Sequence, residues 1–241
     1  MHDNILFRPV IRMKPLARVE KSNLSSRIYE EIRSRLMNGQ YAPGDRLRIN
    51  DLAEKLGTSI TPVREAIFRL VSEQALEMTA ATSIMVPALD ADTVGEIQLM
   101  RRLLEGAAAK QAAQRITPKE IRHLSLTHDE FIEAVAVSPS EAAERNRDFH
   151  FELMAAAGMP TLSATVETMW VRMGPLLHTF HSHLPPREIS NRSHPHYRVL
   201  AALRKGDAEG ASQAIQEDIE WGQRVLLEWM AERERDEVAA T

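Results

Sequence analysis

The sequence predicts a mostly α-helical protein in which a short segment of helices and a β-hairpin is followed by an all-helical bundle. Two observations predict this fold class. From Asp90 onward, apolar residues recur at the three- and four-residue spacing of helices with one buried face. Before that point, two short β-prone runs, Leu76–Met78 and Ile84–Val86, flank a polar loop that suits a hairpin. The spacing of the apolar residues changes at Pro87, which separates the two segments.

Length and composition favour two domains. A chain of 241 residues suits two domains, because domains cluster near about 100 to 150 residues. We expect an arm at 1–21, a first domain at 22–87 and a second domain at 88–241. The absence of cysteine excludes disulfides and thiolate metal sites. Because the sequence shows neither a signal peptide nor a membrane span, we expect a cytoplasmic protein with no membrane partner.

The formal charge of −4 is divided unevenly between the two segments. Residues 1–87 hold 13 Lys and Arg against 10 Asp and Glu, whereas residues 88–241 hold 17 against 24. A basic first segment joined to an acidic remainder fits one domain that meets phosphates and another that does not.

The first domain is predicted to contain a winged helix-turn-helix. In chain order we expect a helix at 22–37, an extended segment at 46–49, helices at 51–56 and 61–75, and the hairpin. Asn50 and Thr61 are the expected N-caps of the two short helices, and Pro62 suits the first turn of the second. Two short helices joined by the tight turn 57–60 and followed by a hairpin form this motif, whose second helix enters the major groove of DNA.

Polar side chains around the second short helix are therefore candidates for contact with double-stranded DNA. Hydroxyls near a helix N-terminus suit a phosphate, and an arginine one turn further on can reach a base edge, guanine by preference. The candidates are Arg48, Asn50, Thr58, Ser59, Thr61 and Arg64. The alternative is an ordinary helical hairpin in which Arg64 is merely solvated.

Three stretches of the first domain resemble the DNA-binding domain of the GntR family of bacterial regulators. They are Tyr41–Leu47 (YAPGDRL), Leu52–Gly57 (LAEKLG) and Thr61–Ile67 (TPVREAI). The resemblance implies that Arg64 and the hydroxyls near Thr61 contact operator DNA. This chain departs from the family at Ile60, where many members carry Arg, and in its uncharged wing loop at 80–83. We therefore hypothesise that basic residues of the arm add DNA affinity: Arg8, Arg12, Lys14 and Arg18.

The second domain is predicted to be an all-helical bundle, because prolines, glycines and capping residues divide it into helical lengths. The expected helices lie near 90–115, 118–136, 139–157, 160–183, 189–205 and 207–234. Asn146 and His150 lie four residues apart and so share a helix face. His196 and Asp218 are expected near the middle of the last two helices. Together these four side chains would make a plausible set of ligands for a divalent ion inside a bundle. The alternative is that His150 is a buried, hydrogen-bonded histidine and binds no metal.

This domain resembles the FCD effector domain of the FadR subfamily, on the motifs Arg101–Glu105 (RRLLE), Asp148–Leu153 (DFHFEL) and Leu200–Asp207 (LAALRKGD). Many such domains bind a metal through one Asp and three His. By motif, those positions hold Asn146, His150, His196 and Asp218 here, so two ligands have changed. Zinc, manganese or nickel would suit a mixed nitrogen and oxygen site.

Arg101 matches an arginine that faces the same cavity in the family, and a guanidinium can hold a carboxylate with two hydrogen bonds. The resemblance therefore implies a small carboxylic acid as effector, with Arg102 as the second candidate. The alternative for Arg101 is a structural pair with Glu105, four residues on. A histidine-rich stretch, His178 to His194, is expected to be solvated or to make dimer contacts. Trp170, Trp221 and Trp229 are expected in core or dimer packing.

The function predicted from the sequence is that of a homodimeric transcription factor, acting as a repressor that an acid releases from its operator. In one alternative the helical domain only dimerises and its metal and effector pocket is not functional. A remote alternative is a helical-bundle metalloenzyme, which needs paired Glu-x-x-His motifs. Only Glu120 and His123 fit that pattern, and no nucleophile elbow or phosphate-binding glycine loop occurs. An enzyme is therefore not expected.

Overall fold

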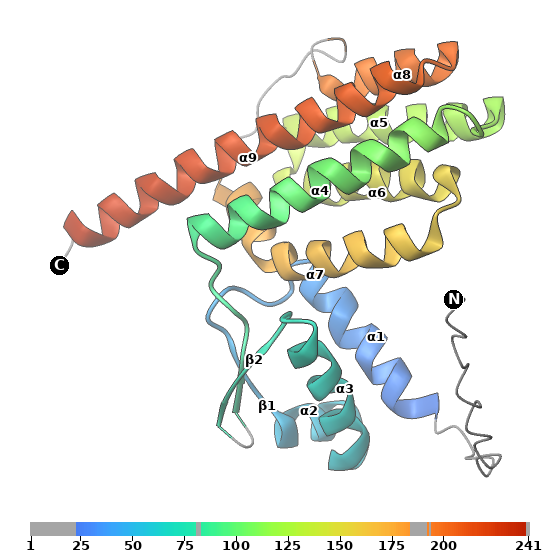
Figure 1. Ribbon diagram of the computed structural model, residues 1–241. Coiled ribbons are helices and arrows are strands. Elements are labelled where there is room, and N and C mark those ends of the chain that lie inside the picture. The colour runs from blue at the N-terminus through green and yellow to red at the C-terminus, as the bar shows by residue number, and fades with distance from the viewer. Residues whose placement is uncertain (1–22, 81–82, 184–191, 193, 240–241) are drawn as a thin grey trace, which may run out of the picture.

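The computed structural model describes residues 23–80, 83–183, 192 and 194–239. A small unit of helices and strands lies beside a larger helical bundle, and a long first helix runs from the small unit to the bundle (Figure 1). The small unit contains α1 (Asn23–Met37), β1 (Arg46–Arg48), α2 (Ile49–Lys55), α3 (Ile60–Ser72), β2 (Glu77–Ala80) and β3 (Ser83–Met85). The predicted fold class is confirmed.

The three strands form an antiparallel sheet in the order β1-β3-β2, in which Ile84 of β3 lies opposite both Leu47 and Met78. Leu47 and Ile84 are buried, whereas Met78 is exposed. The helices cover this buried face with apolar side chains of α1 and α3, among them Ile32, Leu36, Ile67 and Leu70. The β2–β3 hairpin is thus the wing that follows the two short helices, and β1, which precedes them, completes the sheet.

The expected caps of the two short helices were wrong. The N-cap of α2 is Arg48, so Asn50 lies inside the first turn, and the N-cap of α3 is Ser59, so Thr61 is the second residue of that helix. Neither cap makes a side-chain hydrogen bond. Each helix begins early enough to include an isoleucine, and Ile49 is fully buried. Burial of Ile49 outweighs the local capping preference of Asn50.

The bundle consists of α4 (Ala91–Ala112), α5 (Pro118–Val137), α6 (Pro139–Ala157), α7 (Pro160–His183), α8 (Pro195–Lys205) and α9 (Ala208–Ala239). Strong local signals fix several starts: Thr117 and Glu120 form a capping box, and Ser138 caps α6 before Pro139. None of the helices in the described ranges is long and apolar enough to cross a membrane.

The start of α8 differs from the prediction, which placed it near 189. Its N-cap is His194, whose Nδ1 accepts a hydrogen bond from the backbone N–H of His196, and Pro195 occupies the first turn. His196 consequently lies in the first turn of α8, so the prediction that it lies near the middle of its helix was wrong. Histidine is not among the usual capping residues, so the sequence gave no capping signal there.

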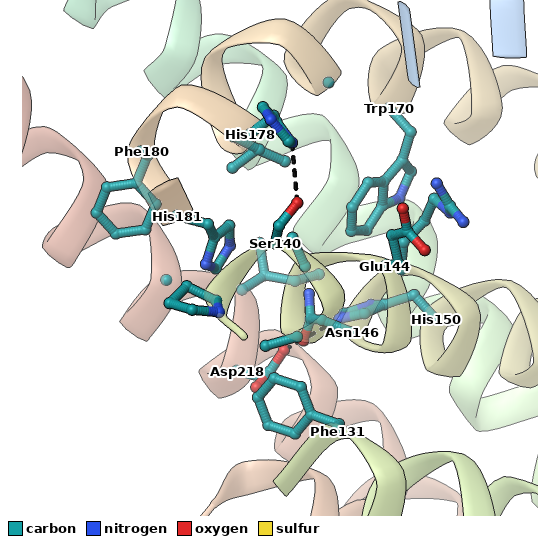
Figure 2. Close-up of a pocket in the computed structure, with 18 of the residues that line it drawn as sticks. Phe131, Ser140, Glu144, Asn146, His150, Trp170, His178, Phe180, His181 and Asp218 are labelled. Atoms are coloured by element: carbon teal, nitrogen blue, oxygen red, sulfur yellow. Dashed lines mark hydrogen bonds and ion pairs between the residues drawn. The ribbon is translucent and has the colours of Figure 1, made fainter. Parts of the chain in front are cut away.

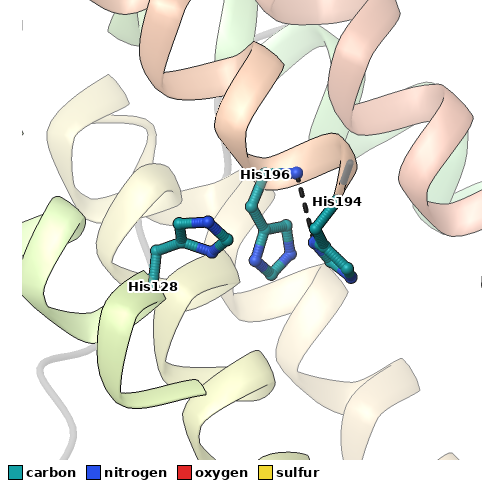
Figure 3. A group of neighbouring side chains, drawn as sticks. All are labelled: His128, His194 and His196. Carbon is teal, nitrogen blue, oxygen red and sulfur yellow. Dashed lines mark hydrogen bonds between the residues drawn. The ribbon is translucent and has the colours of Figure 1, made fainter. Parts of the chain in front are cut away.

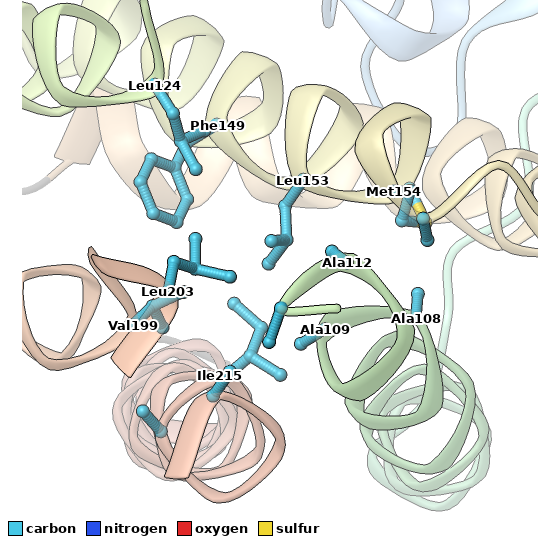
Figure 4. Packing of buried hydrophobic residues seen from close by; sticks show 14 of the residues in the cluster. Ala108, Ala109, Ala112, Leu124, Phe149, Leu153, Met154, Val199, Leu203 and Ile215 are labelled. Atoms are coloured by element: carbon cyan, nitrogen blue, oxygen red, sulfur yellow. The ribbon is translucent and has the colours of Figure 1, made fainter. Parts of the chain in front are cut away.

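Small residues allow α4 to lie deep in the bundle. Ala108, Ala109 and Ala112 are fully buried and face Leu153 of α6 and Ile215 of α9 (Figure 4). Because an alanine adds only a methyl group, the neighbouring helices approach α4 closely. The long helices α4 and α9 lie side by side in this core (Figure 1).

The small unit and the bundle share a packed junction at the end of α1. Val171 of α7 belongs to the apolar core of the small unit. Arg33 of α1 donates to Glu167 of α7 at 2.9 Å. A Cβ on Gly174 of α7 would lie 2.4 Å from the carbonyl oxygen of Leu36 and 2.7 Å from the Cα of Met37. The backbones of α1 and α7 are therefore in direct contact.

Gly174→Ala is expected to destabilise the protein by about 1–3 kcal/mol, because backbone atoms of α1 occupy the place of the new methyl group. Gly95→Ala in α4 is the matched control. No atom lies within 4 Å of its new Cβ, and alanine favours a helix over glycine by about 1 kcal/mol. Thermal unfolding of both variants tests the junction, and an unchanged melting temperature for Gly174→Ala would contradict it.

Candidate functional site

The predicted DNA-contacting side chains lie in the small unit, and all but one of them are exposed. Arg64 is exposed on α3, and Ser59 and Thr61 are exposed at its start, while Thr58 is half-buried. Arg48 and Asn50 are exposed at the start of α2. Ile60, where the family resemblance led us to expect an arginine, is 41% exposed. The arm and residues 81–82 of the wing lie outside the described residues.

His150 lies between two carboxylates in the core of the bundle. Its Nδ1 is 2.6 Å from Oε2 of Glu105 on α4, and its Nε2 is 3.1 Å from Oδ2 of Asp218 on α9. All three side chains are buried. Since carboxylates only accept hydrogen bonds, both ring nitrogens of His150 donate. One imidazole on α6 thus connects α4 to α9.

Arg101 on α4 extends this series of buried hydrogen bonds, which we call the buried chain. Its Nε donates to Oε1 of Glu105 at 2.8 Å, and its Nη1 donates to Oε1 of Gln98 at 3.0 Å. Its guanidinium carbon lies 3.9 Å from the ring centre of Trp170. The side chain is only 4% exposed. The pair with Glu105, which was the alternative interpretation of Arg101, is therefore present.

Opposite charges outweigh burial in this chain. Burial raises the pKa of Glu105, but Arg101 and His150 more than offset it and hold it at about 2. Burial lowers the pKa of His150, but Glu105 and Asp218 outweigh burial and raise it to about 9. Burial raises the pKa of Asp218, yet the facing imidazoles of His196 and His150 hold it well below its usual range. Two positive and two negative groups therefore balance in the core.

His196 and His194 complete the surroundings of Asp218. Nε2 of His196 lies 3.5 Å from Oδ2 of Asp218, and Nε2 of His194 lies 3.9 Å from Oδ1. Burial lowers the pKa of His194 to about 3 and that of His196 to about 4. Both imidazoles are therefore neutral, as a metal ligand must be.

The residues present fit a divalent metal ion. Ligand atoms of His150, His196 and Asp218 all lie within 4.8 Å of one another. His196 is fully buried, yet neither of its ring nitrogens has a hydrogen-bond partner. Glu105 holds Nδ1 of His150 and thereby aims Nε2 at the other two ligands, an arrangement typical of metal-binding histidines. A bound ion would displace the proton that Nε2 donates to Asp218, since a ligand nitrogen must offer its lone pair. The structure thus brings together three of the four predicted ligands.

A cavity of about 120 Å³ opens beside these ligands. Asn146, the fourth predicted ligand, lines it together with His150 and Asp218 (Figure 2). Arg101, Arg147 and Trp170 also line it. Because a single water needs about 10–15 Å³, the cavity has room for a small molecule.

One wall of the cavity belongs to the small unit. Met37 and Asn38, at the end of α1, are among the lining residues. Nη1 of Arg147 on α6 donates to Oδ1 of Asn38, and Nη2 donates to Asp148 at 3.0 Å. The sequence did not single out Arg147, because its position beside α1 arises only when the two units pack together.

Other predicted residues lie elsewhere. Arg102 does not line the cavity. Its Nη1 lies 3.6 Å from Oε1 of the exposed Glu220. His178 and His181 lie within α7 and line the cavity, and Ser140 hydroxyl lies 3.4 Å from His178 Nδ1. His194 is only 3% exposed, so the expectation that it is solvated or at a dimer surface was wrong. His194 caps α8 and packs against neighbouring aromatic rings, which buries it beside Asp218.

Glu105→Gln tests whether the buried chain stabilises the fold. The change removes the negative charge between Arg101 and His150, so the free energy of unfolding is expected to fall by about 3–5 kcal/mol. Glu209→Gln is the control, because Glu209 pairs with Lys110 on the surface and such pairs contribute about 0–1 kcal/mol. Urea unfolding measures both changes, and equal effects would contradict the role of Glu105.

Comparisons with known proteins agree with this arrangement. Residues 24–86 match the family of bacterial regulatory proteins called gntR, and residues 96–220 match the FCD domain. The HTH-type transcriptional regulator McbR of Escherichia coli (strain K12) is 31% identical over 217 residues, covering 90% of this chain and 98% of McbR. The Nta operon transcriptional regulator of Aminobacter aminovorans is 33% identical over 172 residues, covering 69% of this chain and 78% of that regulator.

A solved structure of E. coli McbR/YncC shares the fold, with a TM-score of 0.78 and 32% identity over 86% of this chain and 98% of that one. Sequence and fold therefore agree across both units. The chain belongs to the GntR family of bacterial transcriptional regulators, in the FadR-type subfamily with an FCD domain.

Proposed function

We propose that the chain is a transcriptional repressor whose DNA binding is controlled by a small carboxylic acid in the bundle, together with a divalent metal ion. The observation that carries this proposal is the composition of the cavity. Its walls hold the guanidinium of Arg101, two metal-ligand candidates, His150 and Asp218, and the end of the first helix of the DNA-binding unit. A ligand there would touch both units at once.

The ion would be held by His150, His196 and Asp218, with the amide oxygen of Asn146 as a further donor. When bound, it supplies a positive centre that attracts a carboxylate. Arg101 and Arg147 supply the two guanidinium groups on the cavity wall. Both already hold protein partners, so an acid would compete with Gln98 at Arg101 and with Asn38 at Arg147. Loss of the second contact would loosen the end of α1.

The chain is proposed to act as a homodimer on an operator with two-fold symmetry, as helix-turn-helix proteins commonly do. Leu99, Met100 and Leu103 form an exposed apolar strip on α4, and Leu103 is 58% exposed. Such a strip is costly in water and suits a second copy of the helix. An acid regulates this dimer only by binding more tightly to the form that does not fit the operator.

Arg64→Ala is expected to weaken binding to an operator duplex about 10- to 100-fold, since a bidentate contact to a base contributes about 1–3 kcal/mol. Arg64 is exposed, so the fold should not change. Arg224→Ala, an exposed arginine on α9, is the control and should leave affinity unchanged. Fluorescence anisotropy with duplexes selected from random sequence measures both. Equal affinity of Arg64→Ala and the unaltered chain would contradict a reading role for Arg64.

Metal removal is expected to abolish the response to acids. Protein treated with a chelator, then supplied with Mn²⁺, Zn²⁺ or Ni²⁺, is screened with small carboxylic acids by thermal shift. At an acid concentration of about 100 times Kd, binding adds about 2.7 kcal/mol of stability, which raises the melting temperature measurably. Asp218→Asn should lose the metal-dependent part of the shift.

The absence of any shift with every ion and acid would favour the alternative in which the helical domain only dimerises. The metalloenzyme alternative gains no support from its one motif. Glu120 belongs to the capping box of α5, and His123, 70% exposed, pairs with Glu152.

A further inference from the structure

His196 has two ring nitrogens that lack a hydrogen-bond partner, although the side chain is fully buried. The ion position described above explains only one of them. Its Nε2 faces Asp218 at 3.5 Å. The two nitrogens of an imidazole point in different directions, so Nδ1 requires another partner. A buried polar atom without a partner is unfavourable, and its presence calls for an explanation.

A second group of histidines shares His196 with the first position. Ligand atoms of His128 on α5, His194 and His196 all lie within 4.8 Å of one another. The ring centre of His196 is 4.4 Å from that of His194 and 5.5 Å from that of His128 (Figure 3). These three side chains are 1%, 3% and 0% exposed, in the order His128, His194 and His196.

The surroundings hold two of these imidazoles in place. Nδ1 of His194 accepts the backbone N–H of His196 at 3.3 Å, so Nδ1 carries the lone pair of the neutral ring, and an ion bound by His194 would take the place of this long hydrogen bond. His196 stacks on Phe149 with ring centres 3.8 Å apart and planes 9° apart, so its orientation is fixed. The ring centre of Phe131 lies 4.7 Å from that of His194. Both residues line the cavity. An ion can therefore approach the group from the cavity.

We propose that His128, His194 and His196 form a second, nitrogen-only position for a divalent ion, an alternative to the position beside Asp218. Three imidazoles favour ions that prefer nitrogen ligands, such as Cu²⁺, Ni²⁺ and Zn²⁺, over Mn²⁺. A neutral imidazole has one lone pair, so His196 serves one position at a time. The proposal rests on the proposed function only in sharing His196 with the first ion position.

Ring packing alone does not account for the group. Phe131 and Phe149 already fill neighbouring parts of the same core, and a third apolar ring in place of His196 would pack without leaving two nitrogens unpaired. An ion at either position would bind one of these nitrogens.

The test compares Cu²⁺ and Mn²⁺ binding to variants of the full chain by isothermal titration, with electron paramagnetic resonance of the Cu²⁺ complexes. Asp218→Asn removes the carboxylate of the first position. Mn²⁺ binding should then be lost, whereas Cu²⁺ should remain bound with a spectrum that shows coupling to three nitrogens. Adding His128→Gln should lower the Cu²⁺ affinity about tenfold or more, as loss of even an outer partner does.

His123→Gln, on the same helix but exposed, is the matched control and should leave Cu²⁺ affinity unchanged in the Asp218→Asn background. His194→Gln provides a second variant if His128→Gln unfolds, which circular dichroism reveals. The proposal is overturned if Asp218→Asn alone abolishes Cu²⁺ binding, or if neither histidine variant changes it. If Mn²⁺ fails to bind the unaltered chain while Cu²⁺ binding needs His128, the first position fails and the second stands.

Discussion

A buried chain of charged hydrogen bonds from Arg101 through Glu105 and His150 to Asp218 is the interaction on which the helical domain depends. Charges inside a core are tolerated only when each has a partner, so the chain fixes how α4, α6 and α9 sit relative to one another. It also determines the chemistry of the cavity. Because Glu105 holds one nitrogen of His150, the other is aimed at Asp218 and the neighbouring imidazoles.

The junction with the DNA-binding unit places this chemistry where it can be transmitted. The end of α1 forms part of the cavity wall, and close backbone contact at Gly174 makes the junction stiff. From there α1 leads directly into the core that supports α3 (Figure 1). A small shift of α1 would therefore move α3. Packed junctions of this kind tend to switch between discrete arrangements rather than deform gradually.

Most of the fold could be predicted from local signals, and most of the site could not. Capping residues and prolines predicted the starts of α5 and α6 near 118 and 139, where the structure has them, because capping is a local interaction. The family resemblance pointed to His150, His196 and Asp218, which do lie together. The contact between Glu105 and His150 and the burial of His194 were not predicted, since both arise from the packing of helices far apart in the sequence.

The most direct test of the account is calorimetric. Affinity for a carboxylic acid selected by the thermal-shift screen is measured twice in the presence of metal, once with the free chain and once with the chain saturated by its operator duplex. Because coupling between two ligands is reciprocal, an acid that releases DNA must bind the DNA complex more weakly than the free chain, by the same factor. We expect a reduction of about 5- to 150-fold, the usual range for coupled sites. Equal affinity in the two states would contradict control of DNA binding from this cavity.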